Sequence, residues 1–311
     1  MADFVIIPDA TCDLPRELRE RFDIPDYIPG VLYLPDGTES RSDLDWENMT
    51  QKEFYSILKQ KDAFFKTASA SIGEAQAVIE KQFAKGLDVL IVTIAARMSV
   101  TYDICVKAGE ALKEAYPERR LVVFDSLRYS AGISVQVVAA ASLRKQGKSL
   151  DETVAWLQAN SDRVHQMGPL DDLFFCRKMG RVSNMSAIMG TLIGIRPMAD
   201  FNRDGANTVI GKTKGAKKAE AATVEYVRRT VEHPEEQIIF VAHSNREEEA
   251  LSLKARLEQE IAPREIIIIP IGQACGPNIG PGLVAAYYYG KPISEGLAEE
   301  SAIMADILSA K

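Results

Sequence analysis

Short, unbroken apolar runs rich in valine and isoleucine are the feature that most limits how this chain can fold. Each run is four to six residues long and lacks the apolar–polar alternation of a half-exposed strand: Phe4–Ile7, Val89–Ile94, Leu121–Phe124, Ile238–Ala242 and Ile266–Ile269. Strands that are apolar on both faces are typical of parallel sheets covered by helices on either side. The chain is therefore predicted to build its core around such strands.

Between these runs, apolar residues recur at helical spacing. The clearest helical patterns are Ile72, Ala75, Ile79 and Phe83 after Ser71, then Ile104, Ala108, Leu112 and Ala115 after Ser99, and the stretches 131–146 and 215–231. Strands that alternate with helices along the chain predict an α/β fold.

The second half of the chain has a different pattern. A turn-rich stretch lies near residues 160–170, and further on Ile195–Ala199 and Thr208–Ile210 flank an Asn-Arg-Asp-Gly turn, which predicts an antiparallel hairpin. A length of 311 residues suits two domains of ordinary size. We expect two α/β domains, residues 1–165 with a mainly parallel sheet and residues 166–311 with a mixed sheet.

Composition excludes several classes of function. The net charge of −7 disfavours general nucleic-acid binding. No apolar stretch reaches the roughly 20 residues of a membrane span, and the N-terminus lacks the pattern of a signal peptide, so we expect a cytoplasmic protein. The four cysteines, Cys12, Cys105, Cys176 and Cys275, are far apart and suggest neither a disulfide framework nor a zinc site.

Two hydroxyl-rich segments stand directly before predicted helices. Ser71 and Glu74 form a capping box, which accounts for Ser71 but leaves Thr67 and Ser69 available to face a ligand. Ser99 and Thr101 follow the strand Val89–Ile94 at the edge of the sheet where α/β proteins bind ligands. Free N–H groups and the helix dipole at such a junction attract a carboxylate or a phosphate. For each segment, simple helix capping is the alternative interpretation.

Two loops carry further candidates. Gly276–Gly282 contains Asn278 and Gly280, and its Pro281 suits the first turn of a helix through Leu283–Tyr288. The stretch 177–183 places three cations, Arg181 among them, on a loop that contains glycine, where they could bind a phosphate or an acidic partner. The alternatives are an unliganded Gly/Pro loop and a solvated charged loop.

Catalytic patterns are weak. None of the three histidines, His165, His233 and His243, lies in these loops, and there is no G-x-S-x-G elbow. The acidic stretch Ser42–Asp45 lacks the spacing of a calcium loop and is predicted to start a helix. We therefore expect no catalytic residue, no metal and no cofactor.

The order of these motifs resembles the DegV family over essentially the whole chain. The matching segments, each quoted with the family pattern, are Asp9–Pro15 (D-S-T-x-D-L-P), Tyr27–Val31 (V-P-L), Thr67–Ser71 (T-S-x-P-S), Ser99–Tyr102 (S-G-T-Y), Asp125-Ser126 with Ser130 and Gly132 (D-S and S-x-G), Lys178–Ser183 (K-G-G-R-I-S), Arg196-Pro197 with Asp204-Gly205 (K-P and D-G), and Gly280–Gly282 (G-P-G).

The resemblance implies a fatty-acid-binding protein without catalytic activity of its own. In the family, a long-chain fatty acid lies between the two domains. Its carboxylate is held by hydroxyls of the two hydroxyl segments and by a histidine two positions before G-P-G, the position of Asn278 here. By this carry-over Thr67 and Ser99 bind the carboxylate, with Ser69 and Thr101 beside them, and Arg181 and Gly280 lie at the mouth of the head-group site. Some members serve a separate catalytic subunit of a fatty-acid kinase, which is then a partner.

The chain departs from the family pattern at the head-group site. Asn278 stands where the family has a histidine, Val100 replaces the glycine of S-G-T, and Met179 replaces the first glycine of G-G-R. Asparagine can donate a hydrogen bond but cannot carry a positive charge. Two other functions stay open: a divergent member with a small-carboxylate ligand or a decayed, regulatory site, and a serine hydrolase that uses Ser99 or Ser71.

Overall fold

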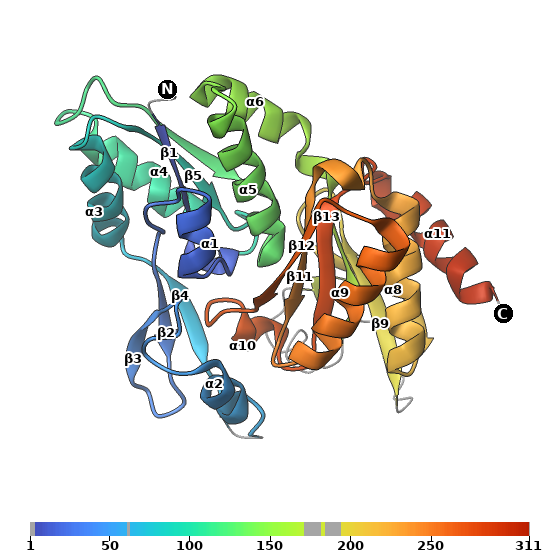
Figure 1. Ribbon diagram of the computed structural model, residues 1–311. Coiled ribbons are helices and arrows are strands. Elements are labelled where there is room, and N and C mark those ends of the chain that lie inside the picture. The colour runs from blue at the N-terminus through green and yellow to red at the C-terminus, as the bar shows by residue number, and fades with distance from the viewer. Residues whose placement is uncertain (1–3, 61–62, 171–181, 184–193, 311) are drawn as a thin grey trace. The chain divides into compact units, whose positions relative to one another are not determined.

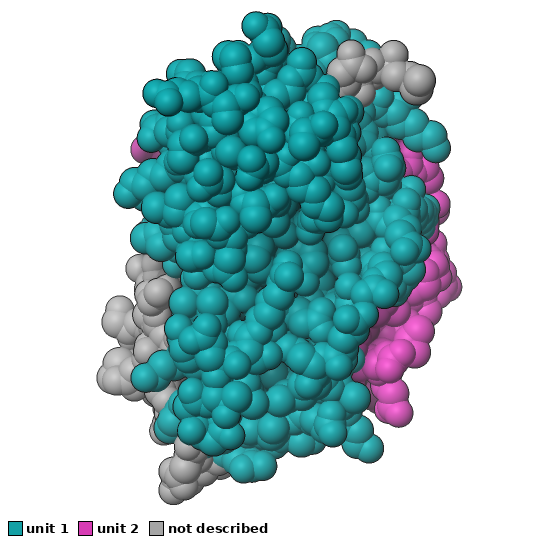
Figure 2. Space-filling model, turned by 90° about the vertical axis from the view of Figure 1, so that its left-hand side faces the viewer, with its two compact units in different colours: residues 1–161, 272–277 teal, residues 162–271, 278–311 magenta. Residues whose placement is uncertain are grey.

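The computed structural model describes residues 4–60, 63–170, 182–183 and 194–310. The chain forms two compact units, coloured separately in Figure 2: unit 1 comprises Met1–Ser161 and Gly272–Pro277, and unit 2 comprises Asp162–Ile271 and Asn278–Lys311. The predicted boundary between two domains after residue 165 stays a prediction.

Unit 1 is built on a three-stranded parallel sheet in the order β1-β5-β6, formed by β1 (Phe4–Pro8), β5 (Asp88–Thr93) and β6 (Leu121–Asp125). Its helices are η1 (Ala10–Cys12), α1 (Arg16–Arg21), α2 (Gln51–Leu58), α3 (Ile72–Phe83), α4 (Thr101–Leu112), α5 (Ala131–Lys145) and α6 (Leu150–Ala159). Val5, Ile7, Val89 and Ile91 share one core with α3 and α4, while α5 lies on the other side of the sheet (Figure 1). The predicted parallel sheet is confirmed.

A second, antiparallel sheet in unit 1 was not predicted from the sequence. It has the order β3-β2-β4, with β2 (Gly30–Tyr33), β3 (Glu39–Ser42) and β4 (Lys66–Ser69). These strands are short and partly exposed, so they lack the apolar runs that reveal the main sheet. Thr67 and Ser69 therefore lie on a strand that leads into α3.

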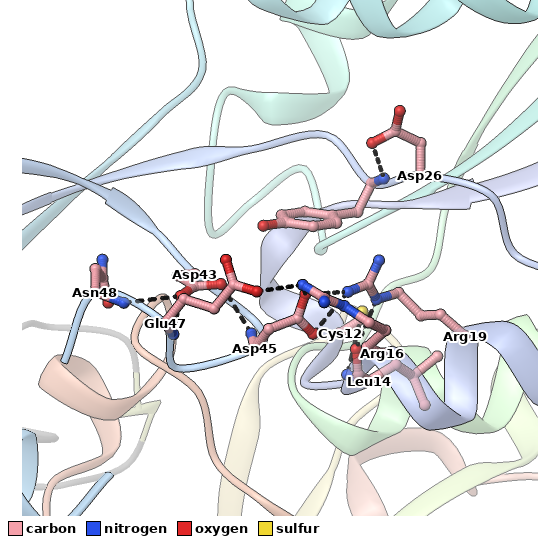
Figure 3. Close-up of polar contacts among 10 residues, drawn as sticks. Cys12, Leu14, Arg16, Arg19, Asp26, Asp43, Asp45, Glu47 and Asn48 are labelled. Carbon is pink, nitrogen blue, oxygen red and sulfur yellow. Dashed lines mark hydrogen bonds and ion pairs between the residues drawn. The ribbon is translucent and has the colours of Figure 1, made fainter. Parts of the chain in front are cut away.

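The acidic stretch Ser42–Asp45 does not start a helix, so that prediction is wrong. The carboxylate of Asp43 accepts backbone N–H groups from Asp45 (2.9 Å) and Asn48 (3.2 Å), which closes a loop instead of a helical turn (Figure 3). Helix α2 begins only at Gln51, after a capping box formed by Thr50 and Glu53.

The same loop is joined to α1 by a partly buried ion pair (Figure 3). Both oxygens of Asp45 accept from the Arg19 guanidinium at 2.6 and 2.7 Å, and Arg19 also donates to the carbonyl of Leu14 at 3.2 Å. Arg19 is 8% exposed, so the pairing with Asp45 offsets the cost of removing its charge from water.

Unit 2 contains a seven-stranded mixed sheet in the order β12-β11-β13-β7-β9-β10-β8. Its strands are β7 (Val164–Pro169), β8 (Val182–Ser183), β9 (Ile195–Phe201), β10 (Asn207–Lys214), β11 (Ile238–His243), β12 (Glu265–Pro270) and β13 (Val284–Tyr289). Strands β9 and β10 form the predicted antiparallel hairpin, and β11 and β12 run parallel. The expected mixed sheet is confirmed.

Three long helices of unit 2, α8 (Ala216–Thr230), α9 (Glu247–Ile261) and α11 (Ala298–Ser309), contribute to one apolar core on the sheet. The short helices are α10 (Gly276–Ile279), which runs across the boundary between the units, and the 3-10 turns η2 (Ser161–Arg163), η4 (Pro234–Glu236) and η5 (Glu295–Leu297). None of the helices in the described residues is both long and apolar enough to cross a membrane.

The predicted helix through Leu283–Tyr288 is wrong, because these residues form β13. This strand pairs antiparallel with both β11 and β7, and its aromatic and small side chains suit a buried central strand. Gly280 and Gly282 have φ values of +81° and +106°, so Pro281 lies in a turn between two left-handed residues and does not open a helix.

Removal of Arg19, a buried cation of unit 1, is predicted to destabilise the protein. Arg19→Ala leaves Asp45 without its main partner, and we expect the free energy of unfolding to fall by about 3 kcal/mol, measured by chemical denaturation. Lys148→Ala is the control, because the Lys148–Glu152 pair is exposed and its loss is expected to have no measurable effect. Equal stability of the two variants would contradict the prediction.

Candidate functional site

Three hydroxyl groups from two elements of unit 1 meet at the start of α4. Ser69 Oγ, at the end of β4, lies 2.9 Å from Ser99 Oγ and 2.9 Å from Thr101 Oγ1, and the last two oxygens are 2.8 Å apart. We call these three residues the hydroxyl triad. The sequence proposed these residues as candidates separately, and the fold of unit 1 brings them together.

The triad is held in place by the local backbone on both sides. Ser69 is in register with Gly30 on β2, and the Oγ of Ser99 accepts the backbone N–H of Thr101 at 3.3 Å. Val100, at the start of α4, has φ −78° and ψ 6°, which any residue can adopt without strain. A valine in place of the family's glycine therefore leaves this turn undistorted.

The backbone loop that carries Ser99 is fixed by carboxylates at the carboxyl edge of the parallel sheet. Asp9 Oδ2 accepts the N–H of Ile94 at 2.7 Å, and Asp125 Oδ1 accepts the N–H of Ala96 at 3.2 Å. Asp9 also accepts the backbone N–H of Thr11 at 2.8 Å, as well as its hydroxyl. Burial raises the pKa of Asp9, and the hydrogen bonds from Thr11 and Ile94 offset part of that rise.

Chemically, the triad can exchange its internal hydrogen bonds for bonds to an anion. Each of the three hydroxyls has one proton to donate, so the three protons are enough for the three hydrogen bonds within the triad. Rotation about the C–O bonds turns these protons toward a bound carboxylate at little cost. The unpaired N–H groups in the first turn of a helix, together with the helix dipole, add attraction for a negative charge. The arrangement therefore suits a carboxylate.

The other residues predicted to bind the ligand are not part of the hydroxyl triad. Thr67 lies two residues before Ser69 on β4, hence on the same face of that strand, and is half-buried. Asn278 is half-buried in α10, and Gly280 is buried in the turn before β13; both belong to unit 2. Arg181 and the thiol of Cys176 lie outside the described residues.

The turn that contains Gly280 is fixed by a serine that the sequence analysis missed. The backbone of Ser244, directly after β11, accepts from the N–H of Gly282 at 3.1 Å, and its Oγ accepts from the N–H of Leu283 at 2.7 Å. Nothing in the local sequence marks Ser244, because its role depends on the pairing of β11 with β13.

Ser71 has the capping role that the sequence predicts. Its Oγ accepts the N–H of Glu74 at 3.2 Å, and Glu74 returns a hydrogen bond to the N–H of Ser71 at 2.8 Å. Ser71 is thus engaged at the start of α3, next in the chain to the triad but not part of it.

The histidines His165 and His243 hydrogen-bond to neighbouring protein groups, and His233 is exposed. His165 is fully buried in unit 2, where Nδ1 lies 2.6 Å from Asp200 Oδ2 and Nε2 lies 2.8 Å from the carbonyl of Lys291. His243 Nδ1 accepts the N–H of Arg246 at 3.1 Å, and burial lowers the pKa of His243.

Groups suited to metals and to nucleophilic chemistry are poorly placed in the described residues. The potential metal-ligand cluster there is His233, Glu235 and Glu236, which is fully solvent-exposed. The thiols of Cys12, Cys105 and Cys275 are buried, and burial raises the pKa of Cys105 to about 12, so its reactive thiolate is disfavoured.

Two α/β units, one with a parallel sheet and a hydroxyl triad at its carboxyl edge, define a class of two-domain α/β protein with a candidate anion site. Residues 3–291 match the model of a family described as "uncharacterised protein, DegV family". The chain belongs to the DegV family.

Comparison with known proteins agrees with this assignment. A DegV domain-containing protein of Clostridium perfringens is 30% identical, over 93% of this chain and 98% of the relative. A solved DegV family protein from Thermus thermophilus, described as fatty-acid-binding, has a TM-score of 0.82 at 24% identity, over 93% of this chain and 99% of its own. DegV of Bacillus subtilis, described as a fatty acid binding protein, has a TM-score of 0.77 at 22% identity, over 94% of this chain and 100% of its own. Structural similarity at this identity shows that the fold is shared.

Replacing the capping serine is predicted to lower stability. Ser71→Ala removes the hydroxyl that accepts the N–H of Glu74 and so breaks the capping box, and the free energy of unfolding should fall by about 1 kcal/mol. Ser149→Ala, which removes the equivalent capping box of α6, is the matched control and should behave alike. A Ser71 variant of unchanged stability would show that the cap is not what this residue contributes.

Proposed function

We propose that this chain binds a long-chain fatty acid and holds its carboxylate at the hydroxyl triad. One observation carries the proposal: Ser69, Ser99 and Thr101 converge within 2.9 Å at the start of α4. Solved relatives with the same fold are described as fatty-acid-binding proteins, which supports a lipid as the ligand. Thr67 and Asn278 would add hydrogen bonds to the carboxylate, and Gly280 and Arg181 would lie at the mouth of the head-group site.

The energetics of such a complex divide between head and tail. An ionised carboxylate removed from water must be hydrogen-bonded, since its isolated burial is very costly. The triad and the helix start would therefore offset the desolvation of the head group rather than supply large net affinity. Each methylene of the tail contributes about 0.8 kcal/mol when buried. The tail would set the affinity and the triad would set the orientation, which favours a long-chain ligand over a small carboxylate.

We propose that this chain carries the fatty acid and does not itself catalyse a reaction. The triad oxygens hydrogen-bond to one another, and the buried His165 is engaged by Asp200, so neither supports a serine nucleophile with a histidine base. The resemblance points to presentation of the bound fatty acid to a separate fatty-acid kinase catalytic subunit, which would bring its own cofactors. The free thiols of Cys12, Cys105 and Cys275 fit a reducing compartment, and we propose the cytoplasm.

Mass spectrometry of an organic extract of the purified protein tests this function. We expect a stoichiometric fatty acid from the wild-type protein and its loss or strong depletion from Ser99→Ala, because that change removes one of the three hydroxyls of the triad. Asn278→Ala should also reduce occupancy if the asparagine side chain donates to the carboxylate.

Ser71→Ala is the matched control for the lipid measurement. It removes a serine hydroxyl two residues from Ser69, but one committed to capping, so its lipid content should equal that of the wild type. Wild-type protein that stays empty after incubation with a mixture of fatty acids would contradict the proposed function. Labelling of Ser99 by a fluorophosphonate probe would instead favour the hydrolase alternative.

A further inference from the structure

The segment Gly272–Pro277, here called the strap, belongs to unit 1, although the strands before and after it belong to unit 2. Its contacts with the rest of unit 1 are specific. Gln273 accepts the N–H of Asp43 at 3.0 Å and donates to Asn48 Oδ1 at 2.7 Å, while Cys275 Sγ lies 3.5 Å from the carbonyl of Thr11. The strap leads directly to Asn278, the residue that occupies the family's histidine position.

The first residue of the strap is held by a buried carboxyl group. Asp13 Oδ1 accepts the N–H of Gly272 at 2.8 Å, and Asp13 Oδ2 accepts the hydroxyl of Ser130. Asp13 is 3% exposed and Ser130 is fully buried. We call Asp13, Ser130 and Gly272 the clasp.

Close packing makes the clasp specific for these residues. A Cβ atom at position 272 would lie 2.9 Å from Asp13 Oδ1, so only glycine lets the backbone approach the carboxyl group this closely. Asp13 and Ser130 both have positive φ, +60° and +55°. Such conformations cost roughly 1–3 kcal/mol for residues other than glycine and persist where surrounding contacts enforce them.

We propose that Asp13 is a positioning residue for the ligand site, which, with Ser130, holds the strap and so fixes the point from which Asn278 projects. This inference rests on the proposed function for the role of Asn278. The two aspartates of the segment Asp9–Pro15 then have complementary roles. Asp9 fixes the loop that leads to Ser99, and Asp13 fixes the loop that leads to Asn278.

The electrostatics make this positioning sensitive to pH. Burial raises the pKa of Asp13 to about 7, and the hydrogen bonds from Ser130 and Gly272 limit that rise. The other titratable or charged groups packed around the clasp are Asp9, Cys12, Arg19, Tyr55 and Cys275. A pKa near 7 means that Asp13 changes charge within the physiological range.

The sign of the effect follows from linkage. The folded protein binds the Asp13 proton more tightly than the unfolded chain, whose aspartate pKa is about 3.9. The stabilisation is therefore complete below pH of about 4 and is lost as pH rises through about 7. The neutral acid can donate to Ser130 while it accepts from Gly272. Above pH 7 the carboxylate keeps its hydrogen bonds from Ser130 and Gly272, but the buried charge carries a desolvation cost that release of the strap would relieve.

Asp13→Asn tests the proposal, because asparagine keeps the shape and both hydrogen bonds of the neutral acid but does not titrate. Fatty-acid affinity and amide exchange of residues 272–276 are measured at pH values between about 6 and 8.5. For the wild type we expect Kd and the exchange rate, relative to the intrinsic rate, to increase with pH by at most about tenfold per unit up to about pH 7 and to level off above it. For Asp13→Asn we expect both to stay close to the wild-type values at low pH.

Two further variants keep the outcomes distinct. Asp88→Asn is the matched control, since Asp88 lies at the opposite end of β5, where it accepts the N–H of Arg120 at 3.0 Å; its pH profile should follow the wild type. Ser130→Ala should speed strap exchange at every pH. A wild-type pH profile in Asp13→Asn would overturn the proposal. If no variant binds lipid, the proposed function fails, yet amide exchange in the lipid-free protein still tests the clasp.

Discussion

Two buried carboxyl groups directly after the first strand hold the loops of unit 1 in place. Asp9 accepts the N–H of Ile94, at the end of the neighbouring strand β5, and Asp13 accepts the N–H of Gly272, far away in the sequence. Backbone N–H groups in loops have no ladder partner, so a side chain must satisfy them when they are buried. The five residues from Asp9 to Asp13 thus connect the sheet, the loop that carries Ser99 and the strap.

Burying two carboxyl groups so close together has an electrostatic consequence. Burial is the main cause that raises the pKa of the Cys12 and Cys275 thiols, and the negative charges of Asp9 and Asp13 add to it. This surrounding keeps the two thiols protonated and unreactive, so they behave as small apolar side chains. Burial also raises the pKa of Asp13 to about 7, so Asp13 can take up a proton near neutral pH and the anchoring of the strap depends on pH.

Sequence patterns predicted the main architecture because burial on both faces of a strand leaves an apolar run that can be recognised. Capping boxes and hydroxyls at helix starts could also be recognised in the sequence. Ser71 was therefore predicted as a cap, and the residues of the triad were predicted as ligand candidates. The strand β13 was mistaken for a helix, since Val-Ala-Ala-Tyr-Tyr-Tyr fits either period and Pro281 suggested a helix start. The clasp could not be predicted, because Asp13 and Gly272 are separated by 259 positions in the sequence and no local pattern connects them. Only the two aspartates, Asp9 and Asp13, were visible as part of a motif.

The replacement of the family's histidine by Asn278 changes what the site can respond to. A histidine there would add a positive charge as pH falls and would so make carboxylate binding depend on its own titration. With asparagine, the donors of the proposed site are neutral hydroxyls, an amide and backbone N–H groups, none of which titrates near pH 7. The negative charge of the ligand is then stabilised by hydrogen bonds and by the dipole of α4. The position of these groups depends on the loop that Asp9 holds. Any pH response of the site near neutrality must therefore arise outside the donors themselves, and in unit 1 Asp13 is the group whose pKa, burial and bond to the strap give it that role.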